Sequence, residues 1–254
     1  MDAAVIFNHL NDLHPDIPNP HVRVQVFAVF RKTAFRLPTS LGPMEIILID
    51  QQGGKIIASV DMSLIAIFQD MLVEGRFLHI SRFSLVSYDD HCKLIKKEWK
   101  IRFMLHTQVL PCVAFHLLND GYDPVHYNQI INSVLHPRIA FDVVGQLVEL
   151  RALHVNYRNG QLLQSITFTL QDLEGNRIRG TLWNNLALQL HDYAITHVND
   201  GVPLLCLLNN MLIKQWQVDN TDKHYNYFDS LQDLPGGGML QGQNGGNNAA
   251  FIFI

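Results

Sequence analysis

The sequence of 254 residues is poor in cysteine, with only Cys92, Cys112 and Cys206, which lie far apart along the chain. No CxxC pair occurs, and this excludes a zinc ribbon or a thioredoxin-like motif and argues against a disulfide-built scaffold. We therefore expect a reducing compartment. Charge is also scarce, at 17% of residues, and the net charge of −4 excludes binding of nucleic acid by bulk positive charge.

Long hydrophobic runs are missing as well. The most apolar stretch, residues 202–213, is interrupted by two asparagines and falls well short of the roughly 20 residues that span a bilayer. The first residues lack the basic region of a signal peptide, so we expect a soluble intracellular protein. With 48% hydrophobic residues the chain can bury a core, and its length fits one large domain or two of about 110–130 residues.

Catalytic motifs are also missing. The sequence contains no GxSxG, HExxH or Walker A motif and no GxGxxG after an expected strand. The 13 histidines are scattered, and the pair nearest to ligand spacing, His191 and His197, does not share one helical face. We therefore predict no catalytic residue, no metal ligand and no cofactor. An enzyme with an unusual site is kept as the third hypothesis, after the two binding functions described below.

Alternation of apolar and polar residues dominates the first part of the chain. Residues 22–30 alternate in this way, which predicts a strand with one buried face. The turn QQGG joins two further apolar runs and predicts a hairpin over 44–60. Residues 62–72 carry apolar side chains at helical spacing and predict a short helix. Two more strands, about 75–86 and 93–105, complete a unit of three strands, a helix and two strands.

The same order of elements then returns. The predicted elements are a strand at 139–150, a hairpin of 162–171 and 176–183, a helix at 185–195, and strands at 202–214 and 223–229. The hairpins DQQGGKIIASVD (50–61) and DLEGNRIRGTLW (172–183) align without a gap at an offset of 122 residues. This predicts two tandem copies of one domain, with chance similarity between generic hairpins as the alternative. The matching Asp50 and Asp172 are expected to stabilise their turns.

Five strands with a helix between the third and the fourth are typical of the OB fold. We therefore predict an all-β chain with short helices, made of two tandem five-stranded OB-fold barrels. The first barrel is expected at 1–108 and the second at 139–230, with a linker that contains a short helix at 109–138. The tail, 231–254, is of low complexity and is expected to be disordered.

The second copy supplies two tryptophans and three cations as candidate nucleic-acid-binding residues: Trp183, Trp216, Arg177, Arg179 and Lys214. Arg177 and Arg179 alternate with Ile178, so we expect them on the face opposite to it, where they could meet phosphates. Exposed tryptophans on an OB surface can stack bases, which contributes about 1–3 kcal/mol per base. The alternative for Trp183 is a core residue that caps the barrel.

The first copy supplies mainly cations. Its candidate binding residues at the end of the first strand and in the following loop are Phe30, Arg31, Lys32 and Arg36, with Phe35 beside them. A basic run adds Lys93, Lys96, Lys97, Lys100 and Arg102, of which Lys93 and Lys97 are the candidates, with a solvated strand face as the alternative. Asp61 stands at the position that matches Trp183. Residues 1–108 hold 12 Lys and Arg against 11 Asp and Glu, whereas residues 109–254 hold 7 against 12.

The segments that carry a family resemblance are VRVQVFAVFR (22–31), ILIDQQGGKIIASV (47–60), LNDGYDP (118–124), FDVVGQLVEL (141–150) and FTLQDLEGNRIRGTLWNNLA (168–187). Through them, residues 5–230 resemble the plant-type large subunit of replication protein A. This resemblance implies binding of single-stranded DNA by two OB folds, roles in replication, repair and recombination, and a nuclear location. Trp183 falls on a stacking aromatic of the family and Trp216 falls near another, in the loop after the fourth strand. The matching positions in the first copy, Asp61 and Cys92, are not aromatic.

The resemblance does not extend to the family's zinc-bearing C-terminal domain or its N-terminal interaction domain, so we expect a short or degenerate paralogue. The leading hypothesis is a non-enzymatic protein that binds single-stranded DNA, with other replication protein A subunits or repair factors as further partners. The alternative is an OB-fold protein-interaction module with little affinity for DNA. The non-aromatic Asp61 and Cys92 and the negative net charge favour this alternative.

Overall fold

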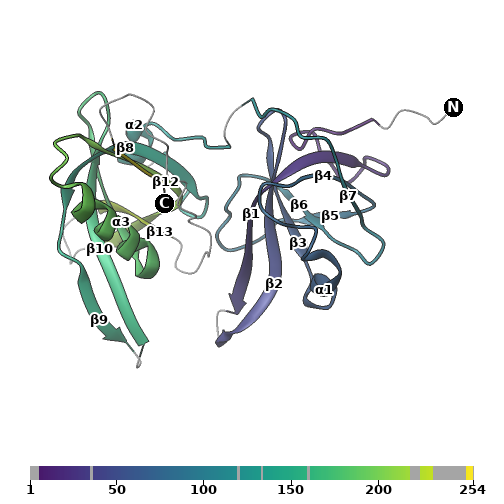
Figure 1. Cartoon of the computed structure of the whole chain (residues 1–254), viewed down its shortest axis with the longest axis horizontal. Helices are drawn as coiled ribbons and strands as arrows, with labels where there is room; N and C mark the ends of the chain where they lie inside the picture. The colour runs from purple at the N-terminus through teal and green to yellow at the C-terminus, as the bar shows by residue number, and fades with distance from the viewer. Residues whose placement is uncertain are drawn as a thin grey trace. The chain divides into compact units, whose positions relative to one another are not determined.

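The computed structural model of the chain describes residues 6–34, 37–118, 121–132, 134–158, 161–217, 224–230 and 250–253 (Figure 1). The described chain divides into two compact units, of which the first ends at Tyr122 and the second begins at Asp123. Each unit is built mainly from strands, with short helices between them. Among the described residues no helix has the length and apolar character needed to cross a membrane.

The first unit is a curled sheet of seven strands. They are β1 (His21–Ala34), β2 (Leu37–Asp50), β3 (Lys55–Val60), β4 (Phe77–Ser81), β5 (Ser84–Ser87), β6 (Trp99–Arg102) and β7 (Gln108–Pro111). Their order in the sheet is β5-β6-β3-β2-β1-β4-β7. Only Arg82 and Phe83 separate β4 from β5, so these two strands act as one interrupted strand. Its first part, β4, pairs with β1 and its second part, β5, pairs with β6, which curls the sheet into a barrel. The helical turns η1 (Met62–Leu64) and α1 (Ile65–Phe68) follow β3.

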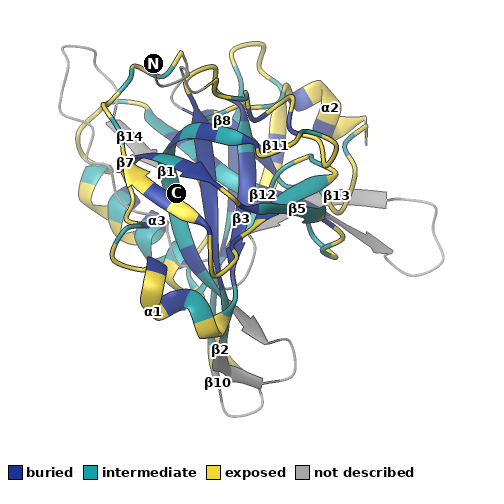
Figure 2. Cartoon of the chain, turned by 90° about the vertical axis from the view of Figure 1, so that its right-hand side faces the viewer, coloured by how far each residue is buried: buried dark blue, intermediate teal, exposed yellow. Residues whose placement is uncertain are grey.

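The core of the first unit lies inside this barrel because alternate residues of its strands point inward. The inward residues of the three central strands are Val22, Val24, Val26, Met44, Ile46, Leu48, Ile56, Ala58 and Val60, and all are buried (Figure 2). Leu10 and Leu13 from the segment before β1 join the same core. Phe68 of α1 meets Phe103 edge to face, with ring centroids 5.1 Å apart, so α1 closes one end of the barrel.

The second unit repeats this plan. Its strands are β8 (Phe141–Leu150), β9 (His154–Arg158), β10 (Gln161–Gln171), β11 (Arg177–Trp183), β12 (Leu204–Gln217), β13 (His224–Ser230) and β14 (Ala250–Phe253), and its helices are α2 (Tyr127–Ile131) and α3 (Asn184–His197). The strands β8, β10, β11, β13 and β12 form a closed ring because β11 pairs with both β10 and β13. The ring has five strands with α3 between the third and the fourth, as predicted.

The two hairpins that align in sequence also coincide in conformation. In each turn the aspartate accepts a backbone N–H bond from the residue four positions later, at 2.8 Å for Asp50 and 2.7 Å for Asp172. The glycine between them is left-handed in both, with φ of 83° at Gly53 and 85° at Gly175. The pairing across β2–β3 and across β10–β11 has the same register, offset by 122 residues. The predicted duplication is therefore real, and the predicted turn-stabilising role of both aspartates is confirmed.

Several elements differ from their prediction. The hairpin predicted to begin at 44 has a longer first strand, because β2 begins at Leu37 and pairs with β1 in a long hairpin. Only β6 forms as a strand within the range expected at 93–105, and residues 94–98 lie outside the sheet. The strands β7, β9 and β14 were not expected. Of the tail, residues 250–253 form β14 parallel to β12, whereas 231–249 lie outside the described residues.

The segment expected as a linker, 109–138, is divided between the two units. Its first part forms the end of β7, which pairs with β4 in the first unit. Its second part contains α2, whose Tyr127 and Ile130 are buried in the second core. The Tyr127 hydroxyl lies so close to Gly145 of β8 that a β-carbon there would overlap it, so α2 docks onto the barrel at a position that only glycine permits.

Candidate nucleic-acid interface

One face of β11 points away from the core of the second unit. Ile178, Gly180 and Leu182 are buried, and the residues between them face outward: Arg177, Arg179, Thr181 and Trp183. Both arginines are exposed, whereas Thr181 and Trp183 are half-buried. The predicted alternation of the two arginines with Ile178 is confirmed.

The neighbouring strand β10 continues this polar surface. Its register places Gln171, Thr169, Thr167 and Ser165 opposite Arg177, Arg179, Thr181 and Trp183, respectively. The Arg177 Nε donates a hydrogen bond to Gln171 Oε1 at 2.9 Å. We call these eight residues the second-unit face. It is built from guanidinium, amide and hydroxyl groups, with an indole at one end.

The charge of the second-unit face is positive. Glu149 of β8 lies opposite Thr169 of this face. Its Oε2 accepts a hydrogen bond from Thr169 Oγ1 at 3.0 Å, and its Oε1 lies 3.5 Å from Arg151 Nε. The Thr169 hydrogen bond and, after it, the neighbouring arginines lower the pKa of Glu149. The carboxylate thus stays charged and is paired with Arg151. Arg177 and Arg179 are exposed cations on β11, which is separated from β8 by β10.

Trp183 ends β11 directly before α3. The next residue, Asn184, is left-handed with φ of 48°, so the chain changes direction there. The indole is half-buried, and its Nε1 is buried without a hydrogen-bond partner among the described residues. Trp183 is therefore neither a sealed core residue nor a freely exposed one. It lies at the edge of the second-unit face and is partly exposed.

The other two candidates of the second unit lie on β12. Lys214 pairs with Tyr227 and Trp216 pairs with Tyr225 of β13, so Trp216 belongs to a strand and the prediction that placed it in a loop was wrong. The β-sheet extends through this hairpin further than the apolar run of the sequence indicated. The side chains of Lys214 and Trp216 lie outside the described residues, and their predicted contacts with DNA stay predictions.

The equivalent face of the first unit has a different chemistry. The 122-residue offset places Ile57 at the position of Arg179, Ser59 at that of Thr181 and Asp61 at that of Trp183. We call Phe30, Glu45, Ile47, Ile57 and Ser59 the first-unit face. All five are buried, with exposed fractions between 1% and 7%. Phe30 was predicted to contact nucleic acid, and this prediction was wrong because other residues of the chain cover it.

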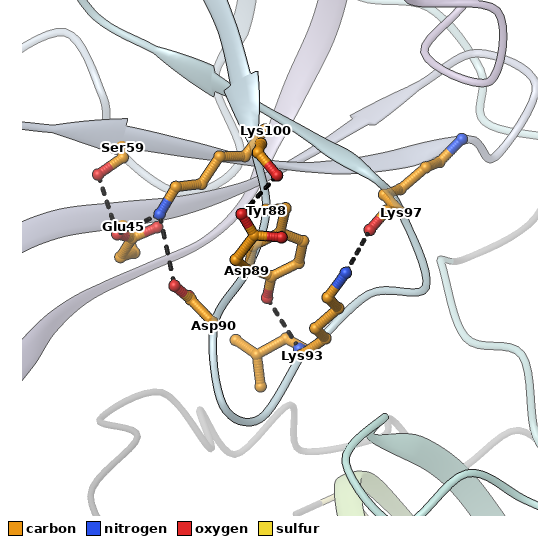
Figure 3. Close-up of polar contacts among 10 residues, drawn as sticks. Glu45, Ser59, Tyr88, Asp89, Asp90, Lys93, Lys97 and Lys100 are labelled. Atoms are coloured by element: carbon orange, nitrogen blue, oxygen red, sulfur yellow. Dashed lines mark hydrogen bonds and ion pairs between the residues drawn. The ribbon is translucent and has the colours of Figure 1, made fainter.

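The cover is the segment 88–98, between β5 and β6, which we call the strap (Figure 3). Tyr88 is buried, and Leu94 and Ile95 pack against the first-unit face. The Tyr88 hydroxyl accepts a hydrogen bond from the backbone N–H of Leu94 at 3.0 Å. Burial raises the pKa of Tyr88 well above its usual range, so the phenol stays neutral.

The predicted basic run is engaged in contacts within the first unit. Lys93 Nζ donates to the Lys97 carbonyl oxygen at 3.1 Å, and Lys97 Nζ donates to Asn11 Oδ1 at 2.8 Å. Arg102 forms a 2.7 Å ion pair with Asp61. Lys93 and Lys97 are half-buried and lie outside the named strands, and their predicted contacts with nucleic acid stay predictions. The two adjacent apolar residues Leu94 and Ile95 pull this segment down onto the sheet.

The remaining candidates of the first unit lie on the β1–β2 hairpin. Arg31 Nε donates a hydrogen bond to the Gly42 carbonyl oxygen across the hairpin at 2.9 Å, so this guanidinium is partly used by the fold. The backbone of Lys32 belongs to the last part of β1. The side chain of Lys32 and all of Phe35 and Arg36 lie outside the described residues.

His, Cys, Asp and Glu side chains are scattered over the part of the chain that the structure describes. No group of three or more His, Cys, Asp or Glu side chains in it is placed to hold a metal ion. Burial raises the pKa of Cys206 to about 12, which keeps this thiol protonated and a poor nucleophile.

Comparison with solved structures identifies the architecture. A replication protein A heterotrimer bound to single-stranded DNA matches over 87% of this chain and 49% of that chain, with a TM-score of 0.50 and 16% identity. The fold is the OB fold, present twice. This chain spans about half the length of that protein chain.

Two further structures resemble the chain. DNA-binding domain A of replication protein A from S. cerevisiae matches with a TM-score of 0.32 and 15% identity, over 43% of this chain and 96% of that one. Fission yeast Pot1 with single-stranded DNA matches with a TM-score of 0.35 and 10% identity, over 92% and 86%. Residues 11–132 match the family model described as domain of unknown function DUF223. A comparison with curated protein sequences found no match.

Proposed function

We propose that this chain binds single-stranded DNA, without catalysis, through the second-unit face. The observation that carries the proposal is the row of outward residues on β11, where two exposed arginines lead to a half-exposed tryptophan on an OB barrel. The resemblance of the sequence to the replication protein A large subunit supports it. So does the likeness in fold to a replication protein A heterotrimer bound to single-stranded DNA.

The face has a role for each kind of group. Arg177 and Arg179 present planar cations that bind phosphate oxygens through charge-assisted hydrogen bonds. Trp183 offers an aromatic surface to a base, and stacking contributes about 1–3 kcal/mol per base whatever the base is. The hydroxyls of Ser165 and Thr167 can donate to phosphate or sugar oxygens. None of these contacts selects a base edge, so the binding is tolerant of sequence.

The charge of the chain sets the strength of this binding. Residues 109–254, most of which belong to the second unit, hold 7 Lys and Arg against 12 Asp and Glu, so this part of the chain attracts a polyanion only locally. We expect modest affinity that falls with added salt, because few phosphate contacts are reinforced by a surrounding positive field. A role in replication, repair or recombination, a nuclear location, and partners among the other replication protein A subunits belong to the same proposal and rest on the sequence resemblance.

The test is fluorescence anisotropy with labelled oligothymidylate at several salt concentrations. We expect binding at low salt, and we expect the double variant Arg177→Ala/Arg179→Ala to reduce the slope of log affinity against log salt by about 1.4, since each phosphate contact on a single strand contributes about 0.7. The matched control Arg76→Ala/Arg138→Ala removes the same charge from exposed positions elsewhere. Absence of binding by micromolar protein at low salt, or an equal loss in the control, would contradict the proposal.

A further inference from the structure

The strap closes the first-unit face with apolar contacts. Leu94 and Ile95 are half-buried and pack against the cluster that contains Phe30, Ile47 and Ile57. Tyr88, at the beginning of the strap, is only 2% exposed. On the second unit, the position that matches Ile57 carries the exposed Arg179. The first-unit face thus has the place of a nucleic-acid interface in the fold, but its residues are buried and, apart from Glu45 and Ser59, apolar.

A buried polar network fastens the strap at one side (Figure 3). Lys100 Nζ lies 3.8 Å from Glu45 Oε1, at the centre of the face, and 3.7 Å from Asp90 Oδ1 on the strap. Glu45 is 1% exposed, and its Oε1 also accepts a hydrogen bond from Ser59 Oγ at 2.9 Å. Lys100 therefore bridges the sheet and the strap. If the strap lifted, this bridge would break and a carboxylate would face the incoming phosphates.

The other side of the strap is fastened to the segment that precedes β1. Lys97 Nζ donates to Asn11 Oδ1 at 2.8 Å and lies 3.4 Å from the carbonyl oxygen of Leu10, which is itself a core residue. Lys93 Nζ lies 5.3 Å from the centre of the Tyr88 ring. Lys97 and Lys100 thus connect the strap to the rest of the first unit, whereas Lys93 contacts groups within the strap.

We propose that the strap permanently occupies the surface where nucleic acid would lie on the first unit, so that the chain binds a single strand with the second unit alone. This inference rests on the proposed function of the second-unit face. Its measurable consequence is the length of strand that one chain occludes. That length should be typical of one OB fold, about 4–16 nucleotides, and should not double with the number of barrels.

The experiment is hydrogen exchange of the full chain, followed by mass spectrometry, with and without saturating oligothymidylate of about 10 and about 30 nucleotides. We expect slower exchange within 165–183 and unchanged exchange within 45–59 and 88–98, with both oligonucleotides. Altered exchange in 45–59 or 88–98 together with slower exchange in 165–183 would overturn the inference and leave the proposed function standing. Altered exchange in the first unit alone would overturn both. Absence of any change in any segment would overturn the proposed function first, and the inference with it.

Two variants test whether the first unit binds DNA once the strap is displaced. Leu94→Asp/Ile95→Asp should speed exchange within 88–98 and leave the affinity for oligothymidylate within about twofold of the wild-type value, because the uncovered face is apolar and acidic. A tenfold gain in affinity, or a doubled occluded length, would overturn the inference. Lys93→Gln, which keeps the strap apolar and removes one cation, should leave the salt dependence unchanged. A lower slope would show that this lysine meets a phosphate.

Discussion

The outer faces of β2–β3 and β10–β11 differ although the two hairpins share a turn, a register and an inward row of apolar residues. Ile57 in one stands where Arg179 stands in the other, and Asp61 stands where Trp183 stands. Inward positions and turn positions are set by the barrel, since a change there costs packing or backbone hydrogen bonds. Outward positions carry no such requirement. The comparison shows that duplication preserved the scaffold and left the two surfaces free to diverge.

The chemistry of each face decides what covers it. A contiguous apolar patch is unfavourable in water, and the first unit buries its patch under the strap. The second-unit face is polar and keeps its two arginines exposed. A binding surface and a sealed surface thus occupy equivalent places on two copies of one barrel.

The largest expected effect on DNA affinity is at Trp183, whose equivalent position in the first unit is Asp61. Trp183→Ala should weaken binding of oligothymidylate about 5- to 150-fold, because one stacked base contributes about 1–3 kcal/mol. Trp183→Phe should retain most of the affinity, since a smaller aromatic ring still stacks. Asp61→Ala is the matched control and should leave the affinity unchanged in the same anisotropy titration. Equal losses in Trp183→Ala and Asp61→Ala would remove the distinction between the faces.

A second comparison concerns the equivalent turn aspartates. Asp50 is 4% exposed and accepts backbone N–H bonds from Leu10, Gln52 and Gly54 at 2.8, 3.0 and 2.8 Å. Asp50→Ala leaves these donors without a partner, and it should lower the free energy of unfolding of the first unit by about 2–4 kcal/mol. Asp172→Ala should cost the second unit less, because water can replace this half-exposed side chain. Native-state hydrogen exchange measures the free energy of unfolding of each unit separately. A larger loss of this free energy in Asp172→Ala than in Asp50→Ala would contradict the prediction.

The smallest expected effect is a pH dependence confined to the first unit. His79 Nε2 lies 2.9 Å from His21 Nδ1, and burial, followed by the neighbouring His21, lowers the pKa of His79 from its ordinary 6.5. His79 therefore binds a proton more readily in the unfolded chain than in the folded one. The contribution of neutral His79 to the free energy of unfolding is complete above about pH 6.5 and is lost as the pH falls through the lower pKa of the folded state. His79→Gln should reduce the loss of stability between about pH 7.5 and pH 5.5 in urea unfolding.

The control for this effect is His106→Gln, which changes an exposed histidine of the same unit. It should lose stability on acidification as the wild-type protein does. If His79→Gln and His106→Gln behave alike, the histidine pair makes no separate contribution to stability.

Local patterns predicted the parts of this structure that local rules govern. The alternation in β1 and β11 and the turns at Gly53 and Gly175 involve residues close in sequence, so the barrels and the outward position of Arg177 and Arg179 could be predicted. The bulge between Val26 and Ala28 could not, and it changes which residues of β1 face outward. Phe30 consequently lies on the outer face and yet is buried.

The strap illustrates what a strand pattern cannot show. Leu94 and Ile95 are adjacent, and adjacent residues of a strand point to opposite faces, so two apolar residues among lysines were a signal against a strand at 93–98. Their destination on the first-unit face depends on contacts with residues far away in sequence. The same holds for β14, whose pairing partner on β12 lies more than 40 residues earlier.

The seating of the strap also affects how the protein is made. Phe30, Ile47 and Ile57 are synthesised before Leu94 and Ile95, and a ribosome that adds about 5–20 residues per second needs about 2–8 s to pass from residue 57 to residue 95. During this interval the outer side of the nascent hairpin presents uncovered aliphatic and aromatic groups. A chaperone that binds such surfaces would therefore be most needed while the first half of the chain is emerging. It would no longer be needed once the strap has been synthesised and covers these residues.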